Sequence, residues 1–164
     1  DKKYAGGGPL MDLGIYCLQG IIYTTGMLPI AVTAQSPPVS NKEIFIDVEE
    51  TITWQMEMPN GAIAECRTSY SGEYQNFLKA ETDKGWFELN PAFSYDGIKS
   101  STSDGKKLQF SKFSQQAKQM DGIAISIKNN QESIVPGEMG RRDMKIIEAI
   151  YKAMNTGKRV AIEW

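Results

Sequence analysis

The chain has 164 residues, a length that fits one domain with a sizeable buried core. Hydrophobic residues make up 41% and charged residues 23% of it, as in ordinary globular proteins. The net charge of -2, without a cluster of Lys and Arg, argues against a nucleic-acid partner. Histidine is absent, which excludes Ser-His-Asp and Cys-His nucleophile systems and His-containing zinc sites, and we assign no metal ligand.

The first predicted element is a helix from Leu10 to about Thr25. Pro9 suits the first turn of a helix, and Gly26 is a typical stop signal. Apolar side chains point almost all round this segment, which predicts a buried helix. Its apolar part is too short, and too interrupted by polar residues, to cross a bilayer, so we expect no membrane partner.

The clearest predicted strand is Thr51 to Met58, where apolar and polar residues alternate. Its partner strand follows the loop Pro59 to Gly61. A three-residue loop with its glycine in the left-handed conformation sets Met56 opposite Ala64, whereas a two-residue loop sets Met56 opposite Glu65. A one-residue slip moves every apolar side chain to the wrong face, so we prefer the three-residue loop.

The other predicted elements continue in chain order. Strands are expected at 29–34, 77–82, 86–89 and 106–110, helices at 115–128 and 140–155, and a short last strand at 159–164. The order of helix, antiparallel strands and helices predicts an α+β fold, with a mainly antiparallel open β-sheet and helices packed on one face. A doubly wound nucleotide-binding fold needs alternating strands and helices. We treat residues 1–164 as a single domain.

The two cysteines, Cys17 and Cys66, each lie in an apolar pattern. We interpret both as buried core thiols, because free cysteine is among the most buried residue types. A disulfide or a reactive thiol is the alternative.

The run Gly6-Gly7-Gly8 stands before the first helix. Such a loop can present backbone N–H groups to an anion at a helix start. However, the fingerprint G-x-G-x-x-G is missing, and no apolar strand leads into the glycines. The alternative is that the glycines allow a close approach of the backbone to a helix or ligand.

Asp12 and Tyr16 are the candidate functional side chains, because their four-residue spacing places both on one face of the first helix. A carboxylate near a helix start is also favoured by the helix dipole, and a buried Tyr hydroxyl also simply needs a partner. Tyrosine titrates near pH 10, so acid–base work by Tyr16 needs a nearby cation that favours its anion. The segment Arg141-Arg142-Asp143 reads as solvated helix charges, and we assign it no catalytic role.

Three ordered segments resemble the C-terminal domain of the glucose–fructose oxidoreductase (Gfo/Idh/MocA) family. They are Gly6-Gly7-Gly8-Pro9-Leu10-Met11-Asp12-Leu13-Gly14-Ile15-Tyr16-Cys17 with Gly26 and Pro29 downstream, Gly85-Trp86-Phe87-Glu88-Leu89-Asn90-Pro91, and the closing stretch from Pro136 through Asp143 and Tyr151 to Val160. The resemblance spans essentially the whole chain, and its glycine–aspartate–tyrosine motif is quite specific.

The resemblance implies a two-domain, NAD- or NADP-dependent oxidoreductase acting on a sugar, a polyol or a related substrate. Its N-terminal Rossmann domain, absent from this chain, would bind most of the cofactor, so we expect the chain alone to bind none and to be inactive. In the family the motif's Asp contacts substrate hydroxyls and its Tyr assists proton transfer, roles that fall on Asp12 and Tyr16. With Tyr rather than His at that position, the chain resembles the sugar, aldose and dihydrodiol dehydrogenase branch of the family. The family's catalytic Lys, in a Glu-Lys-Pro motif on the Rossmann domain, would supply the cation.

The alternative function is a catalytically silent family member whose sheet domain serves binding or assembly. In both cases we expect a homo-oligomer formed through the open sheet face, as the resemblance also implies. The outward side chains expected there are polar but not strongly charged, together with one apolar residue: Thr51, Thr53, Gln55, Ser69 and Ile63. The chain begins at Asp1 rather than Met, so we expect a fragment of a longer protein. Its compartment stays open, with the cytoplasm favoured over the periplasm.

Overall fold

The computed structural model describes residues 1–108, 110 and 113–164. The chain divides into two compact units, one formed by residues 1–73 and 138–164 and the other by residues 74–137. Within the described residues, no helix is long and apolar enough to span a membrane.

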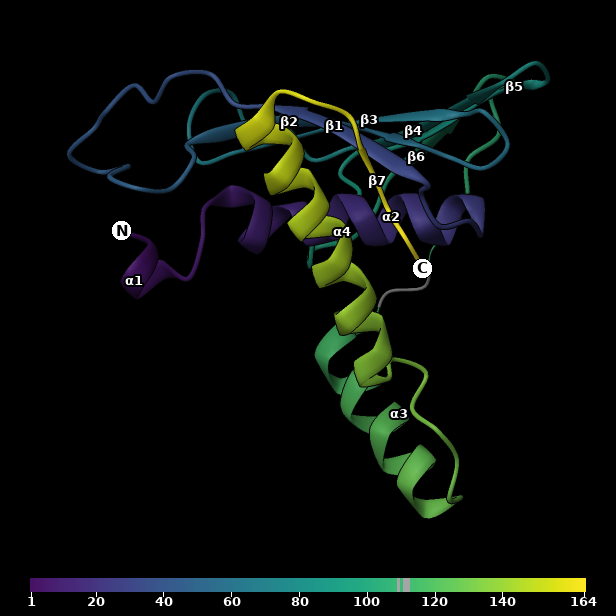
Figure 1. Ribbon diagram of the computed structural model, residues 1–164. Helices are drawn as coiled ribbons and strands as arrows, with labels where there is room; N and C mark the ends of the chain where they lie inside the picture. The colour runs from purple at the N-terminus through teal and green to yellow at the C-terminus, as the bar shows by residue number, and fades with distance from the viewer. Residues whose placement is uncertain (109, 111–112) are drawn as a thin grey trace. The chain divides into compact units, whose positions relative to one another are not determined.

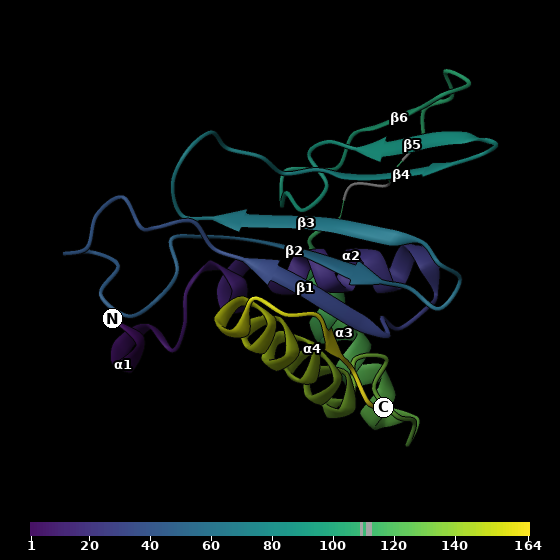
Figure 2. The same cartoon turned by 45° about the horizontal axis from the view of Figure 1, so that its top comes forward.

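The first unit contains a four-stranded antiparallel sheet with the strand order β3-β2-β1-β7. Its strands are β1 (Ala31–Gln35), β2 (Thr51–Glu57), β3 (Ile63–Ser69) and β7 (Val160–Ala161). Its helical segments are α1 (Lys2–Ala5), the π-helix η1 (Leu10–Gly14), α2 (Ile15–Thr25) and α4 (Gly137–Thr156). Figures 1 and 2 show α2 and α4 on the same side of this sheet, which confirms the predicted α+β class.

The core lies between that face of the sheet and the two helices. Its buried members include Leu18 on α2, Ile52 and Met56 on β2, and Ile146 and Ile150 on α4. On β2 the buried residues alternate with more exposed ones, because successive side chains of a strand point to opposite faces.

The register of the β2–β3 hairpin is the one predicted. Met56 pairs with Ala64 and Trp54 pairs with Cys66, and Gly61 has a φ of 85°. Burial of one face fixes this register, since a slip of one residue would turn Trp54 and Met56 to the outer face.

The helix predicted at 10–25, which comprises η1 and α2, differs from the prediction in two respects. It begins with the π-helical segment η1, and only one stripe of it, formed by Leu10, Gly14 and Leu18, is buried. Tyr23 is 90% exposed. The expectation of a helix buried on all sides is therefore wrong within the described residues, because the sheet covers only the face that carries this stripe.

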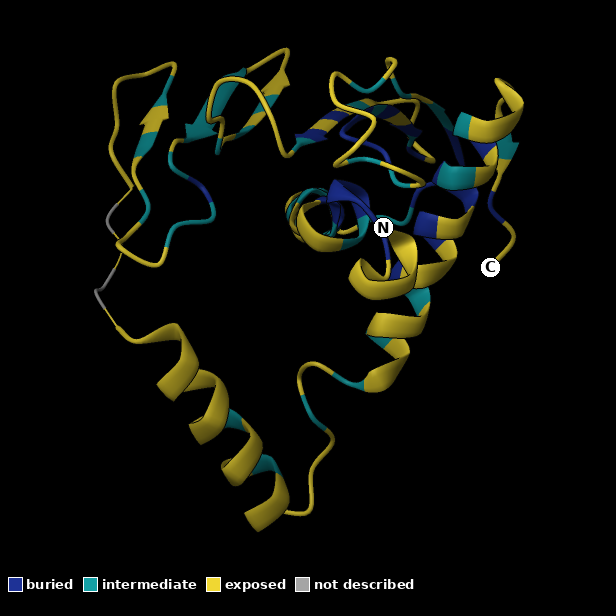
Figure 3. Cartoon of the chain, turned by 90° about the vertical axis from the view of Figure 1, so that its left-hand side faces the viewer, coloured by how far each residue is buried: buried dark blue, intermediate teal, exposed yellow. Residues whose placement is uncertain are grey.

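The second unit contains a three-stranded antiparallel sheet and one long helix. The strands are β4 (Leu78–Thr82), β5 (Gly85–Leu89) and β6 (Ser100–Thr102), in the order β4-β5-β6, and the helix is α3 (Gln115–Lys128). The predicted helix at 115–128 is confirmed, but its apolar stripe is open to solvent: Met120 is 73% and Ile127 is 76% exposed. Figure 3 shows α3 as almost entirely exposed.

The strand predicted at 106–110 is wrong in its described part, residues 106–108 and 110, while residue 109 lies outside the described residues. The third strand of this sheet precedes the turn at 103–105 and pairs with β5. The following segment is joined to β6 by hydroxyl groups: Ser100 accepts from the backbone N–H of Leu108 at 2.7 Å, and Thr102 donates to the carbonyl of Lys106 at 2.7 Å. Side chains thus replace the backbone ladder that a strand would form.

Candidate functional site

The glycine run allows the backbone to lie directly against Glu49. Gly8 is buried, and a Cβ atom at this position would lie 2.5 Å from Glu49 Cδ and 2.6 Å from the Glu49 carbonyl oxygen. Real Cβ atoms do not approach other heavy atoms so closely, so no other residue fits without a shift of Glu49. Gly8 does allow a close approach, but its neighbour is the loop residue Glu49 rather than the helix or ligand that was expected.

The start of η1 already has an anionic partner from the same chain. Glu49, which is 7% exposed, accepts a hydrogen bond from the backbone N–H of Leu10 at 3.0 Å through Oε1. A carboxylate is a favourable partner for the free N–H groups at a helix start. The alternative of an external anion at this helix start therefore loses its support.

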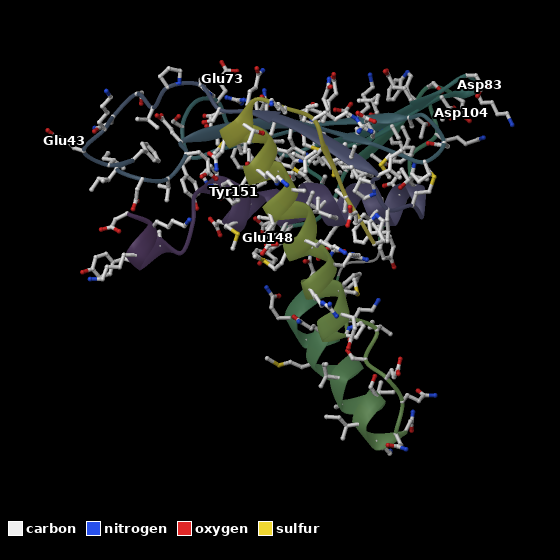
Figure 4. All side chains as sticks on the ribbon, in the orientation of Figure 1. Glu43, Glu73, Asp83, Asp104, Glu148 and Tyr151 are labelled. Atoms are coloured by element: carbon white, nitrogen blue, oxygen red, sulfur yellow. The ribbon has the colours of Figure 1, made fainter. Side chains whose placement is uncertain are left out.

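Tyr151, labelled on α4 in Figure 4, completes this arrangement. Its hydroxyl donates to Glu49 Oε1 at 3.0 Å. Burial and then the negative charge of Glu49 raise the pKa of Tyr151 well above its ordinary value. Glu49 thus connects the helix start to α4, and it fixes the segment that carries Asp12.

Asp12 and Tyr16 both lie at the surface of the first unit. Asp12 belongs to η1, and Tyr16, 43% exposed, belongs to the first turn of α2. Single π-helical turns inside helices occur frequently at functional sites. Gly14, between the two residues, brings this turn close to the sheet, because a Cβ there would lie 2.7 Å from Leu10 and 3.5 Å from the ring of Trp54.

The structure brings Asp12 together with Tyr70, a residue that the sequence analysis did not single out. Tyr70 directly follows β3, and its hydroxyl donates to Asp12 Oδ2 at 3.0 Å. Partial burial, and then the hydrogen bond to Asp12, raise the pKa of Tyr70 to about 12. The phenol therefore stays protonated, and remains a donor, at neutral and moderately alkaline pH.

The sequence contained a signal for Tyr70. The confirmed register turns Cys66 and Thr68 toward the helices, and both are buried. Because a strand alternates with a period of two, the next residue on that face is Tyr70. The partner of this face, η1, could not be read from the strand itself, since Asp12 is 58 residues away in the sequence.

Asp143 corrects another interpretation of the sequence. Rather than a solvated helix charge, it is 3% exposed. It accepts hydrogen bonds from Gln19 on α2 and from Arg142 Nε and Nη2, the latter two at 3.0 and 2.9 Å. Burying a carboxylate is costly unless it is paired, so this cluster serves to join α2 to α4.

The two thiols, Cys17 on α2 and Cys66 on β3, hydrogen-bond to each other. Cys66 is buried as predicted, whereas Cys17 is half-buried, and both are free thiols. The shared hydrogen bond lowers the pKa of Cys17, while that bond and burial raise the pKa of Cys66. This contact is a second point, besides Asp12 and Tyr70, at which the first helix meets β3.

A family model described as the GFO/IDH/MocA C-terminal domain matches residues 1–88, more than half of the chain. The chain belongs to the GFO/IDH/MocA family. The matched residues include the glycine run, Asp12, Tyr16, Glu49 and Tyr70.

Two relatives extend the match to nearly the whole chain. An aldose-aldose oxidoreductase from Caulobacter crescentus, whose crystal structure contains glycerol, is 36% identical, with a TM-score of 0.90 over 98% of this chain and 49% of its own. The NADP⁺-dependent D-xylose 1-dehydrogenase of Haloarcula marismortui is 25% identical over 99% of this chain and 46% of its own.

A scyllo-inositol dehydrogenase from Lactobacillus casei, solved with NAD(H) and scyllo-inositol, shares the fold with a TM-score of 0.72 at 17% identity. This match covers 95% of the chain and 48% of the dehydrogenase. The chain therefore spans about half the length of the relatives it matches.

The described residues of this GFO/IDH/MocA domain do not form a Rossmann unit. All of their strand pairs are antiparallel, whereas a Rossmann unit needs parallel strands joined by a helix. The helix start that follows the glycine run is engaged by Glu49. Among the relatives, the D-xylose 1-dehydrogenase is NADP⁺-dependent, and the scyllo-inositol dehydrogenase was solved with NAD(H).

Proposed function

We propose that this chain is the substrate-side domain of an NAD- or NADP-dependent oxidoreductase that acts on an aldose, a polyol or a related sugar. The observation that carries the proposal is the 36% identity, over 98% of the chain, with an aldose-aldose oxidoreductase. A carboxylate and a phenol lie at the surface of its first helix, as expected for groups that meet a polyhydroxy substrate.

In this proposal Asp12 accepts hydrogen bonds from substrate hydroxyl groups, and Tyr16 assists proton transfer at the reacting hydroxyl. A carboxylate accepts through both oxygens, and one oxygen of Asp12 is held by Tyr70. A bound nicotinamide, held mainly by a preceding Rossmann domain, supplies the hydride chemistry. A cation next to Tyr16, from the Lys of that domain, would favour its phenolate and so make Tyr16 a better proton acceptor.

The function is tested with the full-length protein and with the 164-residue chain side by side. We expect the full-length protein to reduce NADP⁺ or NAD⁺ in the presence of D-xylose, D-glucose or a polyol, followed by absorbance at 340 nm. The 164-residue chain should bind neither NADH nor NADPH in calorimetry, because its described strands pair only in antiparallel fashion and form no Rossmann unit. Inactivity of the full-length protein on the whole sugar panel would favour a catalytically silent member, and micromolar cofactor binding by the chain alone would contradict the division of roles.

We further propose that the outer face of the four-stranded sheet forms a homo-oligomer. Ile63, on β3, is 53% exposed on this face. The face is more charged than predicted: Glu65 and Arg67 are exposed, and Arg159 forms a bidentate ion pair with Glu57 at 2.6 Å. Thr51, also expected on this face, is only 9% exposed, and its hydroxyl lies 2.5 Å from that of Ser69.

The chain should therefore form at least a dimer at micromolar concentration, burying on the order of 1,600 Å² between two-fold-related copies. Light scattering coupled to size exclusion should give at least twice the 18.3 kDa mass of the chain. Ile63→Lys should shift the mass toward the monomer, because it places a charge in the interface, whereas Ile44→Lys, at a 63% exposed loop residue, should not. A monomer mass that persists at high concentration would exclude this interface.

A further inference from the structure

Tyr70 is fixed by the sheet on one side and by Asp12 on the other. Its backbone N–H donates to the carbonyl of Glu50 at 3.0 Å, which extends the β2–β3 ladder by one residue beyond β3. Its hydroxyl reaches Asp12 Oδ2 at 3.0 Å, although 58 residues separate the two in the sequence. The ring is 47% exposed, so it is anchored without being part of the core.

The hydrogen bond leaves Asp12 with one oxygen engaged and one available. Within the described residues, Oδ1 of Asp12 accepts no hydrogen bond from another side chain or backbone group, whereas Oδ2 accepts from Tyr70. The terminal torsion of an Asp side chain is broad and has no sharply preferred value. The hydrogen bond from Tyr70 to Oδ2 therefore restricts the direction in which Oδ1 points.

The donor is permanent over the range of pH in which enzymes are assayed. The pKa of Tyr70 is raised to about 12 by partial burial, by the hydrogen bond to Asp12 and by the negative charges of Asp12 and Glu49. A raised pKa means that the protonated phenol is the favoured form, and it is lost only as the pH rises from about 10 through 12. Between pH 6 and 9 the Asp12 carboxylate therefore keeps its donor.

We infer that Tyr70 is a positioning residue for Asp12, orienting its carboxylate so that Oδ1 faces the hydroxyl group of a bound sugar. The inference rests on the proposed role of Asp12 in binding sugar hydroxyls. It assigns to Tyr70 a role in substrate binding, exerted through Asp12 and separate from the proton transfer assigned to Tyr16.

The test uses Tyr70→Phe, Asp12→Asn and the double variant in the full-length protein, with NADP⁺ or NAD⁺ and D-xylose or D-glucose as the sugar. Tyr70→Phe removes one hydroxyl and keeps the ring. We expect it to raise the KM for the sugar by about tenfold, in line with the loss of a hydrogen bond to a charged group, and to leave kcat within about threefold. The matched control is Tyr23→Phe on α2, where the side chain is 90% exposed, and it should change neither constant.

The double variant distinguishes positioning from an independent contact. If Tyr70 acts through Asp12, Tyr70→Phe should add little to the KM already raised by Asp12→Asn, because contacting residues are not additive. The inference would be overturned if the two substitutions raised KM independently, so that the double variant showed the product of both increases. It would also be overturned if Tyr70→Phe lowered kcat without changing KM, or if it had no effect.

A second measurement is independent of activity. Asp12→Asn removes the negative charge that raises the pKa of Tyr70, so an absorbance titration near 295 nm should show one tyrosine ionising at lower pH than in the wild type, and Tyr70→Phe should abolish that difference. If no tyrosine ionised at lower pH in Asp12→Asn than in the wild type, the hydrogen bond between Tyr70 and Asp12 would be disproved. Inactivity of the wild-type protein on every sugar would overturn the inference together with the proposed function. This outcome differs from failure of the inference alone, in which the wild type is active and only the Tyr70→Phe result departs from expectation.

Discussion

Replacing Tyr16 with Phe in the full-length protein is expected to lower kcat by roughly 10²–10⁴-fold, the usual contribution of a positioned acid–base group. The substitution keeps the ring, so the packing of the first turn of α2 should change little. Binding of the nicotinamide cofactor should also persist, because the family's N-terminal domain holds it. Steady-state rates on the best sugar of the panel, with cofactor affinity and thermal melting alongside, measure the effect.

Tyr23→Phe is the matched control, since it removes a hydroxyl from the same helix at a 90% exposed position. It should leave kcat, KM and the melting temperature unchanged. If kcat of Tyr16→Phe stays within about threefold of the wild type, a change in barrier of roughly 0.65 kcal/mol, Tyr16 is a structural residue. The role in proton transfer would then belong to another group.

Loss of the Tyr16 hydroxyl and loss of the Tyr70 hydroxyl are expected to change different kinetic constants. Loss of the Tyr16 hydroxyl should reduce kcat, because it removes a group needed in the transition state. Loss of the Tyr70 hydroxyl should raise KM, because it releases the carboxylate of Asp12, to which Tyr70 is bonded at 3.0 Å. An interaction that binds substrate and transition state equally changes KM and leaves kcat alone. The kinetic split between the two variants therefore separates the proposed chemistry from the proposed substrate binding.

Local patterns predicted the parts of the fold that have one buried face or a clear end signal. Alternation along β2, together with the turn at Gly61, gave the register that pairs Met56 with Ala64. Ser114 caps α3 by accepting from the backbone N–H of Ala117, and the helix has the predicted bounds. In each case a feature close by in the sequence determines the structure: the buried face of β2, the left-handed Gly61 or the N-cap Ser114.

The features that the sequence did not predict depend on distant partners. Asp143 is buried because Gln19, 124 residues away, provides a donor for it. Thr51 is 9% exposed, and its hydroxyl contacts that of Ser69, 18 residues away on the neighbouring strand. The candidate site follows the same rule, since the motif identified Asp12 and Tyr16 but only tertiary structure brings Tyr70 to Asp12.

The glycine run links the fold to the site, since it determines where the segment that carries Asp12 begins. Gly8 lies against Glu49, Glu49 accepts from the N–H of Leu10, and Leu10 begins the π-helical segment. An added methyl group at Gly8 would press on both the side chain and the backbone of Glu49. The buried carboxylate would then have to move away from its two donors, Leu10 and Tyr151.

Gly8→Ala should accordingly lower the free energy of unfolding of the chain by about 2–4 kcal/mol, from overpacking together with weakened hydrogen bonds to a buried carboxylate. For a chain of this size that corresponds to a fall in Tm of about 5–15 °C, measured by thermal or urea unfolding. Gly140→Ala is the matched control, because no described atom lies within 4 Å of a Cβ built there. In the α4 interior, alanine is favoured over glycine by up to about 1 kcal/mol, so the control should be neutral or more stable. Equal stabilities of the Gly8→Ala protein and the wild type would mean that Glu49 can move without loss, and that the glycine run does not fix the position of Asp12.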